Sequence, residues 1–79
     1  TPNPAKDFTI ISYHLPNNTD VQLYIHNVNG QLIQTLIEEK QTAGQHQIKW
    51  DLNNLLSGIY FYTLKTENNI VTKKCIINK

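Results

Sequence analysis

The sequence contains no arginine, no methionine, one cysteine and three isolated glycines among its 79 residues. With no arginine and a formal net charge of +1, it lacks the concentrated basic surface with which most nucleic-acid-binding domains contact phosphates. A single cysteine excludes an internal disulfide, and isolated glycines exclude a glycine-rich phosphate-binding loop. No apolar run approaches the roughly 18 residues that a membrane-spanning helix needs. We therefore expect no nucleic-acid partner, no small-molecule substrate and no cofactor.

The length of the chain and its first residues bear on domain organisation. A chain of 79 residues suits one domain and is too short for two. It opens with Thr1-Pro2-Asn3-Pro4, which suggests a fragment or a mature product. We expect residues 1–79 to form a single domain of a larger host protein.

Alternation of apolar and polar residues dominates the chain and predicts β-strands with one buried face. Residues 11–15 and 21–26 alternate in this way, and the Asn29-Gly30 pair that follows predicts a hairpin turn. The run Leu32–Ile37 also fits a helical stripe, but its surroundings favour a strand with a bulge. The segment 38–44 reads as a polar connection.

The second half of the chain continues the pattern. Residues 45–50 alternate again, with His46, Ile48 and Trp50 on one face. The loop 51–58 holds three leucines that we expect to close one end of the core: Leu52, Leu55 and Leu56. Residues 59–66 are apolar on both faces, which is typical of a central strand, and residues 70–78 form the last strand. Six or seven short strands predict an all-β, immunoglobulin-like antiparallel β-sandwich.

Histidines and carboxylates are the candidates for a metal site or for acid–base catalysis. If strands 11–15 and 21–26 pair as a hairpin, His14 and His26 lie several residue pairs apart, too far to share a metal. His46 belongs to another strand, and the carboxylates are scattered. We therefore expect neither a metal site nor catalytic residues, and no enzymatic activity.

Cys75 and the aromatic residues have structural explanations. Cys75 lies in an apolar strand, where cysteine packs as a small hydrophobe. The aromatic residues could stack on sugars, which would make the domain a carbohydrate-binding or adhesive module. However, Trp50 and Tyr60 fall on predicted inward faces, where a large aromatic usually belongs to the core. A passive spacer domain is a further alternative.

Short motifs follow one another along nearly the whole chain. They are Pro2-Asn3-Pro4-Ala5, Ile11 to Pro16, Val21 to Ile25, Asn29-Gly30, Ala43-Gly44, Trp50-Asp51, Ser57 to Tyr62, Lys73-Lys74 and Lys79. In this order and spacing the chain resembles the type A C-terminal sorting domains of the type IX (Por) secretion system. A related domain of flagellar hook-capping proteins shares the strand patterns, but the opening Pro-Asn-Pro and the terminal lysine favour the sorting domain.

The resemblance implies a function and partners. Such domains are immunoglobulin-like tails of proteins that Bacteroidota-type bacteria export through the periplasm to the cell surface or the medium. Their partners are the host protein, an outer-membrane translocon and a sortase that commonly removes the tail. The family's motif falls on Gly58, Tyr60, Lys74 and Lys79, which the resemblance makes candidates for translocon recognition within the final hairpin, 59–79. An exposed edge strand could also pair with a second copy and give a weak homodimer.

Overall fold

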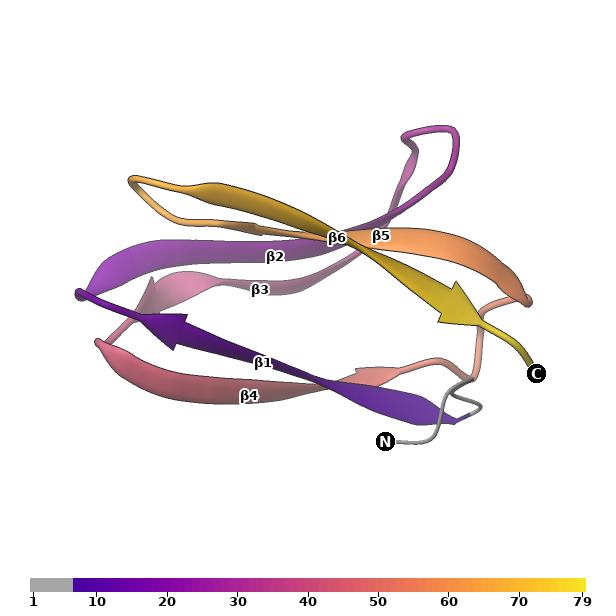
Figure 1. The fold of residues 1–79 in the computed structure, drawn as a ribbon, viewed down its shortest axis with the longest axis horizontal. Coiled ribbons are helices and arrows are strands. Elements are labelled where there is room, and N and C mark those ends of the chain that lie inside the picture. The colour runs from indigo at the N-terminus through magenta and orange to yellow at the C-terminus, as the bar shows by residue number, and fades with distance from the viewer. Residues whose placement is uncertain (1–6) are drawn as a thin grey trace.

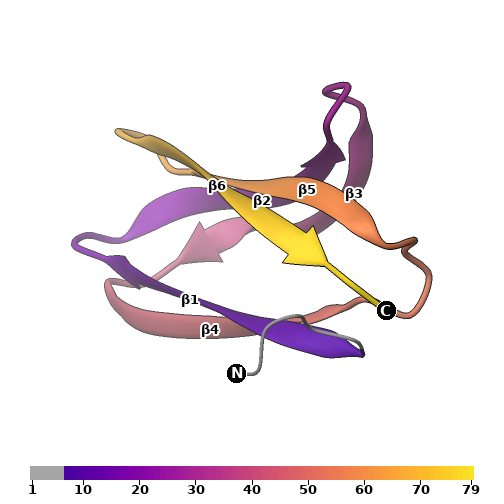
Figure 2. The same ribbon diagram turned by 45° about the vertical axis from the view of Figure 1, so that its right-hand side comes forward.

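The structure, a computed structural model, describes residues 7–79 and arranges them in two stacked antiparallel β-sheets (Figures 1 and 2). The strands are β1 (Phe8–Leu15), β2 (Thr19–Asn27), β3 (Leu32–Gln41), β4 (Gly44–Asp51), β5 (Gly58–Lys65) and β6 (Ile70–Ile77). The smaller sheet has the order β1-β4 and the larger sheet the order β3-β2-β5-β6. This confirms the predicted all-β antiparallel sandwich, with six strands in the part of the chain that the structure describes.

The opening motif, Pro2-Asn3-Pro4-Ala5, lies outside the described residues. Within residues 7–79, no helix is long and apolar enough to cross a membrane.

The β2–β3 hairpin forms at the predicted Asn29-Gly30 turn. The amide of Gly30 donates to the carbonyl of Asn27 at 3.0 Å, and the amide of Asn27 donates to the carbonyl of Gln31 at 3.1 Å. Gly30 has a φ of +82°, a conformation that glycine adopts without steric cost. The turn residue therefore explains where β2 ends and β3 begins.

The predicted pairing of the first two strands is wrong, because β1 pairs with β4 instead of β2. His14 lies opposite Gln45, and His26 lies between Leu32 and Phe61 in the other sheet. Both strands carry one apolar face, and placing them in opposite sheets turns both faces into a single core. The link 16–18 therefore crosses between sheets.

Strand β3 confirms the predicted strand with a bulge and is longer than expected. Register shifts against β2 lie between Leu23 and Tyr24 and between Ile25 and His26. The predicted polar connection 38–44 is wrong, because the strand continues to Gln41. Since β3 is an edge strand with an exposed outer side, its polar residues can pair with β2 without being buried.

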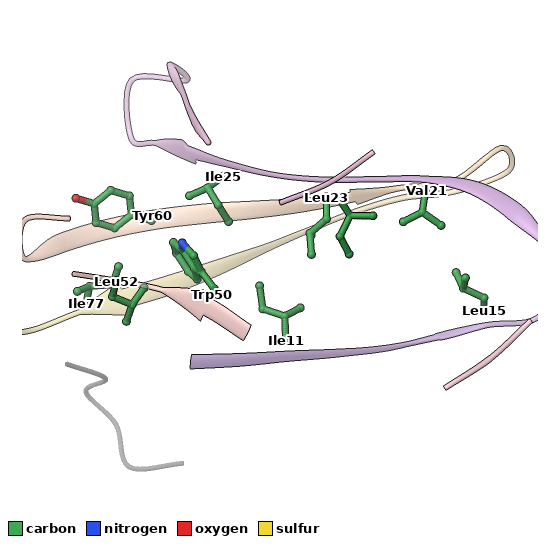
Figure 3. Packing of buried hydrophobic residues seen from close by; sticks show 10 residues of the cluster. Ile11, Leu15, Val21, Leu23, Ile25, Trp50, Leu52, Tyr60 and Ile77 are labelled. Atoms are coloured by element: carbon green, nitrogen blue, oxygen red, sulfur yellow. The ribbon is translucent and has the colours of Figure 1, made fainter. Parts of the chain in front are cut away.

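The core lies between the sheets and is centred on Trp50, which is fully buried (Figure 3). Leu52, which follows β4, is also fully buried, and Leu55 packs against the same cluster. The prediction for Leu56 is wrong, since 82% of its surface is exposed. Its carbonyl accepts a hydrogen bond from the Tyr60 hydroxyl, so the backbone faces the core while the side chain points to solvent. Two of the three predicted leucines therefore close this end of the sandwich.

Candidate functional site

The candidate site lies on the C-terminal hairpin, β5–β6. Its register runs without a break from Gly58 opposite Ile77 to Lys65 opposite Ile70. The turn between the two strands is closed by the amide of Thr66, which donates to the carbonyl of Asn69 at 2.8 Å. As predicted, β5 is central, since it lies between β2 and β6. Strand β6 forms one edge of the larger sheet (Figure 1).

Gly58 begins β5 where the chain enters the larger sheet. Its φ is +157°, a conformation that side-chain-bearing residues rarely adopt. A β-carbon added there would lie 3.9 Å from Cε1 of Tyr60, an ordinary contact distance. The backbone conformation, and not crowding, therefore explains the glycine.

Tyr60 faces the core and joins the two sheets. Only 9% of its surface is exposed, and its ring meets the Trp50 ring edge-on, with centroids 6.5 Å apart. Its hydroxyl donates to the carbonyl of Leu56 at 2.8 Å and thereby holds the loop between β4 and β5. These contacts give Tyr60 a structural role.

The two candidate lysines are exposed, and they lie at different places on the hairpin. The Lys79 amide donates to Oγ of Ser57 at 2.9 Å, which fixes the C-terminus beside the loop that precedes Gly58. Lys74 lies farther along β6 and pairs with Phe61 on the outward face. The structure thus places Gly58 and Lys79 at one end of the hairpin. Lys74 lies next to Cys75, the cross-strand partner of Tyr60, but on the opposite, outward face of the sheet.

The inward face of β6 carries Cys75, which is half-buried and packs against the core. Burial raises the pKa of its thiol above the ordinary value of 9.0. Burial, followed by the charge of Cys75, also raises the pKa of Tyr62. A thiol with a raised pKa is a poor nucleophile at neutral pH, so Cys75 acts as the small hydrophobe that the sequence predicts.

Two of the histidines make hydrogen bonds within the domain. His26 Nε2 lies 2.9 Å from Oγ1 of Thr63, and His46 Nε2 lies 2.8 Å from the carbonyl oxygen of Thr42. His14 is exposed on β1. Among residues 7–79, no group of three or more histidine, cysteine or carboxylate side chains could hold a metal ion.

The sequence points to the final hairpin, 59–79, but not to the outward face of that hairpin, which carries exposed apolar side chains. Ile59 and Ile76, directly opposite each other, are 42% and 50% exposed, and Phe61 follows on the same face of β5. The signal was present in the sequence, because β5 is apolar on both faces. A central position in the sheet also accounts for this pattern, so the sequence alone does not show that one of the two apolar faces is left exposed.

A comparison with protein-family models identifies the family of this chain. The model of the secretion system C-terminal sorting domain matches residues 2–78. The chain belongs to this family. No curated protein and no solved structure matches it significantly. Membership makes the chain a C-terminal sorting signal of type IX secretion, which interacts with the secretion machinery and directs export across the outer membrane. This is a family of sorting signals and not of enzymes.

Proposed function

We propose that residues 1–79 form the single sorting domain at the C-terminus of a larger secreted protein. The outer-membrane translocon recognises the domain through the β5–β6 hairpin, and a sortase then removes it from the exported host. The observation that carries the proposal is the family match over residues 2–78, nearly the whole chain. The host passes through the periplasm and reaches the cell surface or the medium.

The four candidate residues divide into two roles in this proposal. Gly58 and Tyr60 shape the end of the hairpin, because one supplies its backbone conformation and the other its packing against the opposite sheet. Lys74 and Lys79 are exposed and available to a partner. The translocon therefore reads the lysines on a surface that the glycine and the tyrosine hold in place.

The glycan-binding alternative rested on the aromatic residues. Trp50 is fully buried and Tyr60 is 9% exposed, so neither offers a free ring face on which a sugar could stack. The spacer alternative is separated from the sorting role by a secretion experiment.

The experiment fuses residues 1–79 behind a signal peptide and a fluorescent reporter in a type IX-competent host. We expect translocon-dependent arrival of the reporter at the surface or in the medium, and mass spectrometry of the exported reporter should show loss of the tail. Retention in the periplasm both in the parent strain and in a translocon mutant would support the spacer alternative and contradict the sorting role. An exported reporter that keeps its tail would contradict only the sortase step.

The terminal lysine provides a sharper test within the same assay. Lys79→Ala should reduce export, whereas Lys40→Ala, a change of an exposed lysine on β3, should leave export unchanged. The Lys79 hydrogen bond to Ser57 comes from the backbone amide, so the substitution leaves that contact intact. Equal export of both variants would contradict the role of Lys79.

A further inference from the structure

The outward face of β5–β6 is apolar where a solvent-facing sheet is usually polar. Ile59 and Ile76 oppose each other and are about half exposed, and Phe61 opposes Lys74 in the next outward pair. Directly opposed residues lie on the same face of an antiparallel sheet, so these four side chains form one surface. We call Ile59, Phe61, Lys74 and Ile76 the outer patch. Antiparallel sheets with one solvated face normally alternate apolar-inward with polar-outward residues, so the fold alone does not require the outer patch.

The apolar surface continues across the sheet from the outer patch. His26 on β2 lies opposite Phe61, and Leu32 on β3 lies opposite His26. Leu32 is 63% exposed, and the Tyr24 ring lies edge-on to His26 with centroids 5.4 Å apart. Leu32 and Phe61 thus lie on either side of His26. Clustered exposed hydrophobes mark an interaction site more often than scattered single ones do.

Charge is distributed unevenly between this hairpin and the rest of the chain. Residues 58–79 carry four lysines and one glutamate, whereas residues 1–57 carry three lysines and five carboxylates. Lys65 and Lys74 lie on the outward face of the hairpin, and its one carboxylate, Glu67, lies in the turn beyond β5. Charge complementarity therefore favours an acidic partner for this face.

The same charges disfavour a second copy of this chain as the partner. In a two-fold symmetric dimer whose axis passes through the outer patch, Lys74 would approach Lys74 of the other copy. Like charges brought together in this way destabilise an interface. The outer patch therefore fits a different protein better than it fits itself.

We propose that the outer patch docks onto an apolar surface of the type IX export machinery that is rimmed by carboxylates, an inference that rests on the proposed sorting function. Ile59, Phe61 and Ile76 lose solvent contact in the complex, and Lys74 pairs with a carboxylate of the partner. Tyr60, which faces the core, and Gly58, which sets the backbone conformation at the start of β5, keep the strand in place without touching the partner.

Two variants alter the outer patch without touching the core. Ile59→Thr/Ile76→Thr replaces the exposed isoleucines by a polar residue that also favours strands, and Lys74→Glu reverses the central charge. The outer side of the β1–β4 sheet offers matched controls. Phe8 and Ile10 are 46% and 41% exposed there.

The control variants are therefore Phe8→Thr/Ile10→Thr and Lys49→Glu, since Lys49 is an exposed lysine opposite Ile10. The wild-type domain and all variants are immobilised and titrated with the detergent-purified outer-membrane translocon complex. Vesicles containing phosphatidylglycerol are titrated in parallel, and every variant is also tested in the reporter-export assay. Trp50 emission and thermal unfolding establish that each variant is folded.

We expect both outer-patch variants to weaken binding of the translocon complex at least tenfold and to reduce export. The control variants should stay within twofold of the wild type. Because Lys74 is exposed, wild-type binding should also weaken as the salt concentration rises.

Three outcomes would contradict the inference, and each has a different consequence for the proposed sorting function. If the wild type shows translocon-dependent export and the folded outer-patch variants bind and export equally well, the docking surface is wrong and the sorting function stands. If the wild type itself is not exported in a translocon-dependent way, the proposed function fails first. If the outer-patch variants lose only vesicle binding, the partner of this face is a membrane and not a protein.

Discussion

Trp50 is the residue on which the packing of the domain depends most. Its side chain extends from β4 into the space below the larger sheet and is fully buried (Figure 3). Its indole nitrogen has no hydrogen-bond partner among the described residues. A buried donor without a partner costs about 1–3 kcal/mol, so the burial of the large ring must outweigh this cost. The edge-on contact with Tyr60 is part of that burial.

Tyr60 allows a direct test of the structural role of one candidate site residue. Tyr60→Phe keeps the ring against Trp50 and removes the hydrogen bond to the Leu56 carbonyl, so the free energy of unfolding should fall by about 1 kcal/mol. Tyr60→Ala should cost about 3–5 kcal/mol, because it also leaves a cavity. Urea unfolding followed by Trp50 emission measures both values. If the translocon contacted the tyrosine hydroxyl directly, Tyr60→Phe would abolish export while the domain remained folded, and the structural role would be insufficient.

Three partly buried acids make stability sensitive to alkaline pH. Burial raises the pKa of Cys75 above 9.0 and the pKa values of Tyr13 and Tyr62 above 10.0. Above the unfolded-state pKa, the unfolded chain releases protons that the folded chain retains, so the free energy of unfolding falls as pH rises. The stabilising contribution is complete below pH 9.0 for the thiol and disappears as pH passes through the raised folded-state values.

The measurement is urea unfolding at a series of pH values from neutral upward. The wild type should begin to lose stability near pH 9.0, and Cys75→Ala should move this onset to higher pH. Identical alkaline profiles for the wild type and Cys75→Ala would show that the thiol does not contribute.

At the scale of elements, sequence patterns predicted strands better than they predicted partners. The alternation of Val21, Leu23 and Ile25 marks a buried face, and these three side chains are almost entirely buried. Alternation reports only which face of a strand is buried, and a strand can bury that face equally well in either sheet. This is why β1 was expected to pair with β2 and instead pairs with β4. The polar end of β3 was missed because an exposed edge strand can continue through polar residues, which show no apolar alternation.

A row of hydrogen bonds links three strands on the outward face of the larger sheet. Oγ1 of Thr63 on β5 lies 2.9 Å from Nε2 of His26 on β2 and 2.9 Å from Oγ1 of Thr72 on β6. Thr63 is only 3% exposed, so its hydroxyl cannot exchange these partners for water. Thr63→Val, which keeps the shape of the side chain, should lower the free energy of unfolding by about 1–3 kcal/mol.

The neighbouring threonine provides the control for this change. Thr72→Val alone should cost less than Thr63→Val, because Thr72 is exposed and water can replace the lost bond. A double-mutant cycle on the two threonines, measured by urea unfolding, should give a coupling energy above about 0.5 kcal/mol. A coupling energy near zero would mean that the two hydroxyls do not interact in solution.

At the scale of the whole molecule, the sequence pointed to the sandwich, the family and the final hairpin, but not to one face of that hairpin. Alternation placed Tyr60 on an inward face, which the structure confirms, whereas the backbone conformation of Gly58 and the edge-on contact of Tyr60 with Trp50 are seen only in the fold. Lys74 is exposed and Tyr60 is buried, because one face of β5–β6 is turned to solvent and the other packs against the smaller sheet. The outer patch can likewise be identified only from the fold, which shows that this face of β5–β6 is exposed. Periodicity indicates that a strand has two faces, and the full fold is needed to tell which face is left uncovered.

The two sheets should unfold together, since neither is independent of the other. A two-stranded sheet such as β1–β4 is marginal in water by itself, and here it holds Trp50 against Tyr60 of the larger sheet. The crossings between sheets are also tied to each other, because Oδ1 of Asn18 accepts a hydrogen bond from the amide of Ala43 at 2.8 Å.

Residues 1–79 should therefore unfold in one cooperative transition, with an m value in urea of about 1 kcal/mol per molar. Trp50 emission reports on the space between the sheets, and far-ultraviolet circular dichroism reports on all strands, so the two unfolding curves should coincide. A Trp50 transition at lower urea than the loss of strand signal would instead mean that the smaller sheet detaches first, and residues 1–79 would then not be one cooperative domain.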